Sequence, residues 1–558
     1  MNEVLERARA WVADDPDPRD RAELTALIGV ANSGERAAVA ELADRMNGQL
    51  TFGTAGLRGA IGAGPNRMNT AVVTTATAGL CRVLRDDLGE GFRLVVGYDA
   101  RHRSDEFAQT VAAVAVAAGG RVWLMPTTLP TPLLAFAVNA LDADAGVMVT
   151  ASHNPPADNG YKVYLGARMS EPEGAGAQIV PPMDARIFAA ILAAGPASGI
   201  PVANQGWEAV PEQVVADYVT ATSSLVTGGA PLRIVLTAMH GVGAATALRT
   251  LAAAGFDDVT PVAEQIEPDP DFPTVAFPNP EEPGALDLAI ATATTTGADL
   301  IVALDPDADR CSVAVPAGDG WRQLSGDELG ALLGEQAAAA HQGNPHATLA
   351  RSIVSSSLLG RIADAHGVRG AETLTGFKWI SRAPGLVFGF EEAIGYCVNP
   401  TVVRDKDGIS AAVKTCELAS RLKAEGRSLD DQLADLAVRH GLHATSPLTF
   451  RVADLSLIGQ ALDRLRENPP ATLAGARVTS YEDLSAGYQG LPPTDGVRIA
   501  TEAGDRVIVR PSGTEPKLKC YLEVIAPVAE VAQLPQVRQQ AAERLELIKA
   551  ELRTVLGL

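Results

Sequence analysis

The sequence is poor in cysteine and has no long apolar run. Its five cysteines are scattered and never paired as Cys-x-x-Cys, so neither a disulfide framework nor a zinc site is expected. The most apolar segments, such as residues 110–119, are far shorter than the roughly 20 residues that span a bilayer. The charged N-terminus lacks the apolar core of a signal peptide. These absences predict a soluble protein of the reducing cytoplasm with no membrane partner.

Basic residues are also in deficit. The chain carries 46 Lys and Arg against 67 Asp and Glu, a net charge of −21. Nucleic acids and anionic membrane surfaces bind basic faces, so the composition argues against both as partners. A phosphorylated substrate would need cations gathered at one place in the fold.

What the chain does have is material for several cores. A prior of roughly 150 residues per domain predicts three or four domains for its 558 residues. Short strands rich in Val, Leu and Ile alternate with Ala-rich helical stretches, a pattern typical of α/β domains with mainly parallel sheets. The clearest of these strands cover residues 93–99, 121–125, 146–150, 233–237 and 300–304.

Breaks rich in proline and glycine suggest the domain limits. We expect a helical extension followed by three α/β domains and a C-terminal α+β domain. Their predicted limits are 1–46, 47–215, 216–320, 321–445 and 446–558. The last domain would contain a hairpin formed by residues 506–510 and 518–525, followed by a helix.

The first candidate site follows the strand at 146–150. The polar segment 151–162 begins Ala-Ser-His-Asn-Pro-Pro, and ligands of open α/β folds gather at such carboxyl ends of strands. Ser152 could carry a phosphoryl group, and Lys162 could bind an anion or transfer a proton. A turn that only stabilises its own loop is the alternative.

Three aspartates, Asp305, Asp307 and Asp309, follow the strand at 300–304. Side chains at alternate positions of an extended chain point the same way, so the three carboxylates can converge. Converged carboxylates suit a hard cation such as Mg²⁺. An EF-hand is excluded because Arg310 and Pro316 stand where it needs Gly and Glu. A solvated acidic turn remains possible from these residues alone.

Further segments could bind a phosphorylated sugar. Glu391 and Glu392 lie between apolar, strand-like residues, where they could accept hydrogen bonds from sugar hydroxyls or form a structural ion pair. Lys378 and Lys406 each offer a cation in a turn.

The predicted C-terminal hairpin contains a candidate phosphate clamp. Its turn combines an Arg fork, two hydroxyls, a glycine and a Lys, more donors than a plain hairpin turn needs. The residues that supply them are Arg510, Ser512, Gly513, Thr514 and Lys517.

Taken in order, these motifs resemble those of the α-D-phosphohexomutase superfamily, which includes phosphoglucomutases and phosphomannomutases. The similarity runs from residues 51–59 to Lys517, most of the chain. It implies a heart-shaped fold in which three mixed α/β domains and a C-terminal α+β domain surround a central cleft. It also implies an intramolecular phosphotransferase that passes through a bisphosphorylated sugar.

The resemblance further implies roles for single residues. Ser152 would be carried as phosphoserine, and a phosphoserine oxygen would share Mg²⁺ with the three aspartates. Arg58 would approach the phosphoserine, with His153 beside the nucleophile. Lys162 would assist proton transfer.

The substrate would be held by a second set of residues. Arg310 would lie at the site, Glu391 would contact the sugar, and the loop that begins at Arg510 would grip the phosphate that is not transferred. A bisphosphorylated sugar such as glucose 1,6-bisphosphate would serve as activator.

One departure from the family pattern bears on the substrate. Many phosphoglucomutases and phosphomannomutases have Ser two residues after the first Glu of the sugar motif, where this chain has Ala393. That form looks like the phosphoglucomutase-2 branch, whose members include phosphopentomutases and a glucose bisphosphate synthase. We expect interconversion of hexose 1-phosphate and hexose 6-phosphate, with glucose favoured and mannose possible. A pentose 1-/5-phosphate is the alternative.

Two other classes fit the sequence less well. A D-x-D phosphatase using Asp305 as nucleophile would have Thr or Val in place of Asp309. A non-catalytic sugar-phosphate sensor would have lost Ser152 or an aspartate. The sequence leaves open whether the protein is a monomer or a homodimer.

Overall fold

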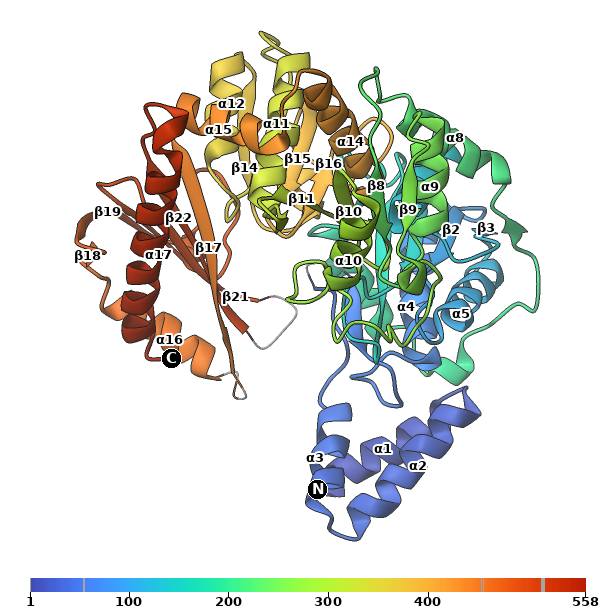
Figure 1. The fold of residues 1–558 in the computed structure, drawn as a ribbon. Helices are drawn as coiled ribbons and strands as arrows, with labels where there is room; N and C mark the ends of the chain where they lie inside the picture. The colour runs from blue at the N-terminus through green and yellow to red at the C-terminus, as the bar shows by residue number, and fades with distance from the viewer. Residues whose placement is uncertain (1, 54–55, 453, 455, 513–516) are drawn as a thin grey trace. The chain divides into compact units, whose positions relative to one another are not determined.

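The computed structural model describes residues 2–53, 56–452, 454, 456–512 and 517–558. The chain forms two compact units, each built from segments that are distant in sequence. The first unit comprises Met1–Thr227, Pro231–Gln323 and Gly395–Cys416, and the second Gly228–Ala230, Leu324–Ile394 and Glu417–Leu558. Figure 1 shows the elements of both units, coloured along the chain.

Three helices open the chain, as the sequence predicts (Figure 1). They are α1 (Asn2–Asp14), α2 (Pro18–Asn32) and α3 (Arg36–Arg45). Asp17 caps α2 by accepting a 2.8 Å hydrogen bond from the Arg19 amide. Arg103 joins α2 to the α/β layer that follows, through ion pairs of 2.7 Å to Asp17 and Asp20.

The first sheet of the first unit combines a parallel centre with antiparallel strands at one side. Its order is β1-β5-β4-β2-β3-β7, with β6 beside β5. The strands are β1 (Leu57–Ala60), β2 (Arg93–Tyr98), β3 (Arg121–Leu124), β4 (Ala145–Val149), β5 (Asp158–Leu165), β6 (Ala177–Gln178) and β7 (Glu208–Ala209). Its helices are α4 (Thr70–Leu88), α5 (Ser104–Ala117), α6 (Thr131–Ala140) and α7 (Met183–Leu192). β4 runs parallel to β2 and antiparallel to β5, so the residues that follow β4 lie beside the start of β5.

The second sheet has the same mixed character. Its order is β12-β11-β10-β8-β9, in which β8, β9 and β10 are parallel. The strands are β8 (Ile234–Thr237), β9 (Val259–Pro261), β10 (Leu300–Leu304), β11 (Cys311–Ala317) and β12 (Gly320–Gln323). Three helices accompany it: α8 (Glu212–Ser223), α9 (Ala244–Ala253) and α10 (Asp287–Thr296). β10 is buried along its whole length, which is why it carries five consecutive apolar residues.

The second unit contains a parallel α/β layer. β13 (Thr348–Ser352) pairs with both β14 (Arg369–Thr373) and β15 (Leu386–Glu391). The helices are α11 (Gly326–Ala340), α12 (Leu358–His366), α13 (Phe377–Ile380) and α15 (Leu429–His440). The chain then contributes β16 (Gly395–Cys397) and the start of α14 (Gly408–Ala424) to the first unit.

The C-terminal sheet is wholly antiparallel, in agreement with the predicted α+β domain. Its order is β17-β22-β21-β20-β19-β18. The strands are β17 (Leu442–Arg451), β18 (Thr472–Leu473), β19 (Ala476–Asp483), β20 (Val497–Thr501), β21 (Arg506–Pro511) and β22 (Lys517–Ala526). α16 (Ser456–Glu467) and α17 (Leu534–Leu556) complete it, and α17 packs on β17 and β22. The predicted hairpin is therefore the β21–β22 pair, while the exact domain limits stay predictions.

The cysteines and the lengths of the helices can be compared with what the sequence predicts. All five cysteines are buried and free: Cys81, Cys311, Cys397, Cys416 and Cys520. Among the described residues, every helix is too short or too polar to cross a membrane.

Candidate active site

Ser152, the nucleophile that the sequence predicts, lies just past the carboxyl end of β4. Its hydroxyl donates a 2.7 Å hydrogen bond to Oδ2 of Asp305. The ring Nδ1 of His153 is 3.3 Å from the same hydroxyl. Ser152 has a φ of 51°, in the left-handed region that non-glycine residues rarely adopt. Such local strain persists only where the surroundings hold the chain firmly.

Arg101 fixes the conformation of the serine loop. Sequence reasoning missed this residue. Its guanidinium donates to the carbonyl oxygens of Ser152 and Asn154 at 2.6 Å each, Pro155 at 2.8 Å and Asp158 at 3.1 Å. Four carbonyls of one loop thus converge on one buried side chain. Arg101 follows β2, the parallel neighbour of β4, and its only sequence signal was its place at the carboxyl end of a predicted strand.

The three aspartates follow β10 and converge, as predicted. Each offers a carboxylate oxygen within 4.8 Å of the others, and all three are buried. Lys162 donates to Oδ2 of Asp307 at 2.7 Å and to Oδ2 of Asp309 at 2.9 Å. Thr131, at the start of α6, donates to Oδ2 of Asp307 over 2.7 Å. Thr131 is a second residue that sequence reasoning missed.

The triad has the free oxygens that a metal needs. Oδ1 of Asp307 and Oδ1 of Asp309 are buried and accept no hydrogen bond from any residue that the structure describes. A buried carboxylate oxygen without a partner is costly. Hard oxygen donors of this number and charge are the ligands of Mg²⁺. The residues present therefore fit the predicted magnesium site.

The electrostatics of the triad lead to the same conclusion. Burial, together with the charges of Asp307 and Asp309, raises the pKa of Asp305 well above its ordinary value. Burial opposes ionisation of Asp309 as well, but Lys162 and Lys406 hold its pKa below the usual range. Two lysines thus compensate part of the negative charge, and a cation would compensate the remainder.

Several residues that the sequence singled out lie around the triad and the serine loop. Nζ of Lys406 lies 3.3 Å from Oδ2 of Asp309. Arg58, on β1, donates to Oδ1 of Asn154 in the serine loop over 3.3 Å. Nε of Arg310 is 3.7 Å from Oδ1 of Asp309. With Lys162 and Arg101, five arginine or lysine side chains therefore lie around the serine and the triad in a protein of strongly negative net charge.

Gly408 allows the turn that carries Lys406 to pack closely against the backbone of the aspartate loop. A Cβ at Gly408 would lie 2.3 Å from the Arg310 carbonyl oxygen, and its amide donates to the Ala308 carbonyl over 3.1 Å. Only glycine allows the backbone of this turn to rest on the aspartate loop.

The other predicted substrate-binding residues belong to the second unit. Glu391 ends β15 and Glu392 follows it. Lys378 lies in α13, and Arg510 lies in β21. The Ser512 amide donates to the Lys517 carbonyl over 2.8 Å. Gly513 and Thr514 fall outside the described residues.

Tyr521, on β22, is a third residue that sequence reasoning missed. Burial raises its pKa, and the charges of Glu392 and Glu391 act in the same direction, while Arg510 opposes them. The phenol therefore lies in the field of both predicted sugar carboxylates and of the predicted phosphate-binding arginine. The residue stands on the strand after the predicted phosphate loop, which was its only sequence signal.

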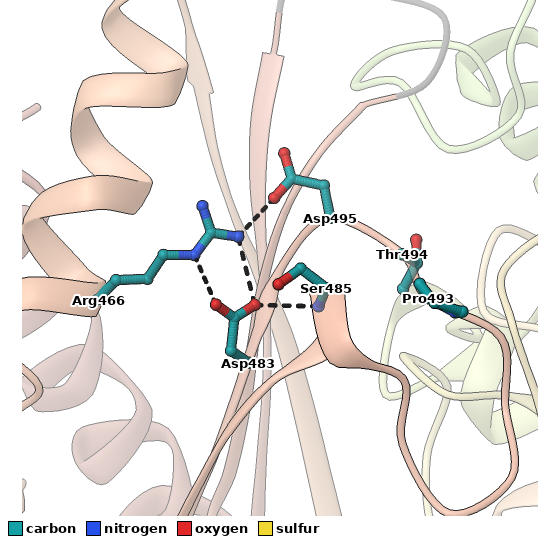
Figure 2. Close-up of a pocket in the computed structure, with 6 residues that line it drawn as sticks. All are labelled: Arg466, Asp483, Ser485, Pro493, Thr494 and Asp495. Carbon is teal, nitrogen blue, oxygen red and sulfur yellow. Dashed lines mark hydrogen bonds and ion pairs between the residues drawn. The ribbon is translucent and has the colours of Figure 1, made fainter.

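The pocket drawn in Figure 2 lies elsewhere, in the C-terminal sheet region. It is lined by Arg466, Asp483, Ser485, Pro493, Thr494 and Asp495. Arg466 is bound to Asp483 at 3.0 Å and to Asp495 at 2.7 Å, so its charge is already compensated. Among the described residues, none of the predicted site residues lines this pocket.

Comparison with known proteins covers most of the chain. The family profiles described as phosphoglucomutase/phosphomannomutase, alpha/beta/alpha domains I, II and III, match residues 49–194, 216–318 and 325–439. The C-terminal domain profile of the same family matches residues 449–540. The four profiles follow one another in chain order.

Individual proteins give the same result. A protein of Haemophilus influenzae described as "Probable phosphomannomutase" is 46% identical over 82% of this chain and 93% of its own length. The human phosphopentomutase is 37% identical over 87% of each chain. A crystal structure of a phosphoglucomutase/phosphomannomutase family protein from Burkholderia thailandensis matches with a TM-score of 0.67 at 22% identity, over 89% of this chain and 97% of that one. The serine and aspartate loops, the four successive domain matches and these relatives show that the chain belongs to the phosphoglucomutase/phosphomannomutase family of phosphosugar mutases, isomerases that transfer phosphate within one sugar.

Proposed function

We propose that the protein interconverts hexose 1-phosphate and hexose 6-phosphate through a phosphorylated Ser152, with glucose as the favoured sugar and mannose as a possible one. The observation that carries the proposal is the 2.7 Å hydrogen bond between the Ser152 hydroxyl and Asp305. This bond places the proposed nucleophile beside three buried carboxylates, whose oxygens are ligands that Mg²⁺ prefers.

The residues around Ser152 divide the work of phosphoryl transfer. Arg58 and Arg310 supply positive charge beside the phosphoserine, which favours an in-line transfer whose charge is spread over the phosphoryl oxygens. Asp305, Asp307 and Asp309 would hold Mg²⁺ together with a phosphoserine oxygen. When bound, Mg²⁺ neutralises charge on the transferring group.

Lys162 is proposed to assist proton transfer. Its ammonium group is buried between Asp307 and Asp309, so its position is fixed by two hydrogen bonds. His153 lies beside the nucleophile, and burial together with the charges of Arg310 and Arg58 lowers its pKa well below 6.5. The imidazole is thus expected to be neutral at neutral pH.

The sugar and its second phosphate are assigned to the second unit. We propose that Glu391 accepts hydrogen bonds from sugar hydroxyls, with Lys378 as a nearby cation. Arg510, Ser512 and Lys517 are proposed to bind the phosphate that is not transferred, together with Gly513 and Thr514. After the first transfer the bisphosphorylated sugar would turn over and return its other phosphate to Ser152.

A pentose 1-/5-phosphate is the second candidate substrate. Ala393 favours it, because this position lacks the hydroxyl that many hexose-specific relatives place there, and so does the 37% identity to the human phosphopentomutase. Glucose 1,6-bisphosphate is proposed as activator of the hexose reaction. The cytoplasmic location and the monomeric or homodimeric state stay predictions.

Coupled turnover assays of glucose 1-phosphate, mannose 1-phosphate and ribose 1-phosphate, each with Mg²⁺ and a trace of bisphosphate, test the proposal. Ser152→Ala is expected to lose more than about 1,000-fold in kcat, since it lacks the phosphoryl carrier. Dominant turnover of ribose 1-phosphate would replace hexose by pentose. A Ser152→Ala enzyme as active as wild type would overturn the phosphoserine mechanism.

A further inference from the structure

A cluster of buried hydroxyls surrounds Glu392 in the second unit. Ser355 donates from its hydroxyl to Oε2 of Glu392 over 2.8 Å and accepts from the Glu392 amide over 2.9 Å. The Ser352 hydroxyl lies 2.7 Å from that of Ser355 and 3.2 Å from the same carboxylate oxygen. Both serines are fully buried. One oxygen of the Glu392 carboxylate is therefore taken up by the protein itself.

The loop that carries these serines is held by strands of the C-terminal sheet. Arg506, on β21, donates to the carbonyl oxygens of Ile353 at 2.8 Å and Ser355 at 2.6 Å. Glu523, its cross-strand partner on β22, accepts from the Ser356 hydroxyl and the Ser357 amide at 2.7 Å each. Arg506 and Glu523 thus form hydrogen bonds with most residues of the loop between β13 and α12.

The two residues that grip the loop form a buried ion pair. Arg506 lies 3.0 Å from Oε2 of Glu523, and the two residues are 7% and 2% exposed. Burial opposes ionisation of Glu523, but Arg506 and His443 hold its pKa below the usual range. A buried ion pair adds little net stability compared with apolar residues of the same size. Its presence here is better explained by the geometry that it imposes.

The backbone of Glu392 is constrained on its other side by α11. A Cβ at Gly326, the first residue of α11, would lie 1.8 Å from the Glu392 carbonyl oxygen. Asp327, the next residue, accepts a 2.6 Å hydrogen bond from the Ser356 amide. The turn after Glu391 is therefore enclosed between the start of a helix and the serine loop.

We propose that Glu392 is a positioning residue rather than a sugar ligand, and that Ser355, Arg506 and Glu523 act through it to hold Glu391 toward the substrate. The inference rests on the proposed function, since it assigns sugar binding to Glu391. Under this proposal the C-terminal sheet carries the predicted phosphate loop and also fixes the position of the Glu391 carboxylate.

The first test compares two amides. Glu391→Gln removes a charge from the sugar contact and is expected to lower kcat/KM for the preferred sugar phosphate by about 100-fold or more. Glu392→Gln keeps an oxygen that can accept from Ser355, so a loss of less than about 5-fold is expected. An equal loss in the two variants would mean that Glu392 touches the sugar, and would overturn the proposal.

The second test removes the hydrogen bond from Ser355 to Glu392, at a residue that is not proposed to contact the substrate. Ser355→Ala is expected to lower kcat/KM by about 10-fold. Hydrolysis of the phosphoenzyme by water, measured without sugar, should stay at the wild-type rate, because that reaction does not use Glu391. Thr348→Val is the matched control, since it deletes a buried hydroxyl of β13, the strand that leads into the serine loop, and this hydroxyl donates to the Pro384 carbonyl rather than to Glu392.

The outcomes separate the inference from the proposed function. A Ser355→Ala enzyme as active as Thr348→Val, or one in which phosphoenzyme hydrolysis falls as much as sugar turnover, overturns the positioning role while leaving the mutase intact. A wild-type protein that turns over no sugar phosphate overturns the proposed function and the inference with it.

Discussion

The Ser152 hydroxyl donates a 2.7 Å hydrogen bond to Asp305, although the two residues follow strands of different sheets. Phosphorylation of Ser152 removes this donor and places a group of about −1.5 to −2 charge beside three buried carboxylates. Lys162 and Lys406 are already paired with Asp307 and Asp309. The phosphorylated form should therefore depend on a divalent cation more strongly than the unphosphorylated form.

Metal removal tests this dependence. Chelation with EDTA is expected to abolish turnover, and Mg²⁺ should restore it. Asp307→Asn should lower kcat by at least about 100-fold, because the metal contributes several kcal/mol to phosphoryl transfer. Titration calorimetry should show tighter Mg²⁺ binding to the phosphorylated protein than to Ser152→Ala. Equal affinities in the two forms would contradict the charge argument.

The serine loop gives a second prediction. Nε of Arg101 lies 3.5 Å from Oδ2 of Asp99. Arg101→Lys keeps this positive charge but cannot donate to four carbonyls at once, since an ammonium has three N–H groups in a compact head. We expect kcat/KM to fall about 100-fold, the size of effect that a displacement of the reacting group by about 1 Å produces. Arg121→Lys, at an exposed arginine of the same sheet, is the control and should be fully active. A fully active Arg101→Lys enzyme would show that Ser152 holds its conformation unaided.

Arg101 also illustrates what the sequence could and could not predict. Ser152 and the three aspartates follow buried strands in segments with a recognisable order of residue types, so each motif could be located along the chain. The contacts of Arg101 with the serine loop depend on β2 being the parallel neighbour of β4. Strand order within a sheet is not encoded in any local pattern, and neither is the approach of Thr131 to Asp307 from α6.

The same limit applies to the fold: single elements were predictable, but their long-range pairing was not. The strands at 300–304 and in the C-terminal hairpin appear in the structure as β10 and the β21–β22 pair because their apolar runs are both long and bounded. Pairing between distant segments was not predictable. Arg506 and Glu523 are ordinary strand residues in the sequence, and only the register of β21 with β22 makes them partners.

The turn at Gly408 supports a third prediction. In Gly408→Ala the new Cβ would meet the Arg310 carbonyl oxygen at 2.3 Å, so the turn must shift and carry Lys406 away from Asp309. A loss of stability of about 1–3 kcal/mol is expected, as for other overpacked sites. Gly360→Ala is the control, because, apart from its chain neighbours and the backbone of its own helix, no described atom lies within 4 Å of its Cβ position. Thermal unfolding and kcat should both report the difference, and equal behaviour of the two variants would show that the turn tolerates a side chain.

Asp327 leads to a prediction on pH. Burial raises its pKa to about 7, the Ser356 amide opposes this shift, and the charges of Glu392 and Glu523 add to it. A carboxyl whose pKa is higher in the folded than in the unfolded state binds its proton more tightly when folded. Stability is therefore lost as pH rises from about 4 to about 7, by an amount of the order of 4 kcal/mol.

Asp327→Asn separates this contribution from the other titrating groups. The amide oxygen can still accept from the Ser356 amide but carries no charge at any pH, so the variant should gain stability over wild type steadily between pH 4 and pH 7 and keep that advantage at pH 8. The measurement is the difference in unfolding midpoint between the two proteins across this range. Asp364→Asn, at an exposed position of α12, should follow wild type at every pH. If the Asp327→Asn difference is the same at pH 5 and pH 8, the carboxyl is ionised throughout, and the two glutamates do not act on it as the structure indicates.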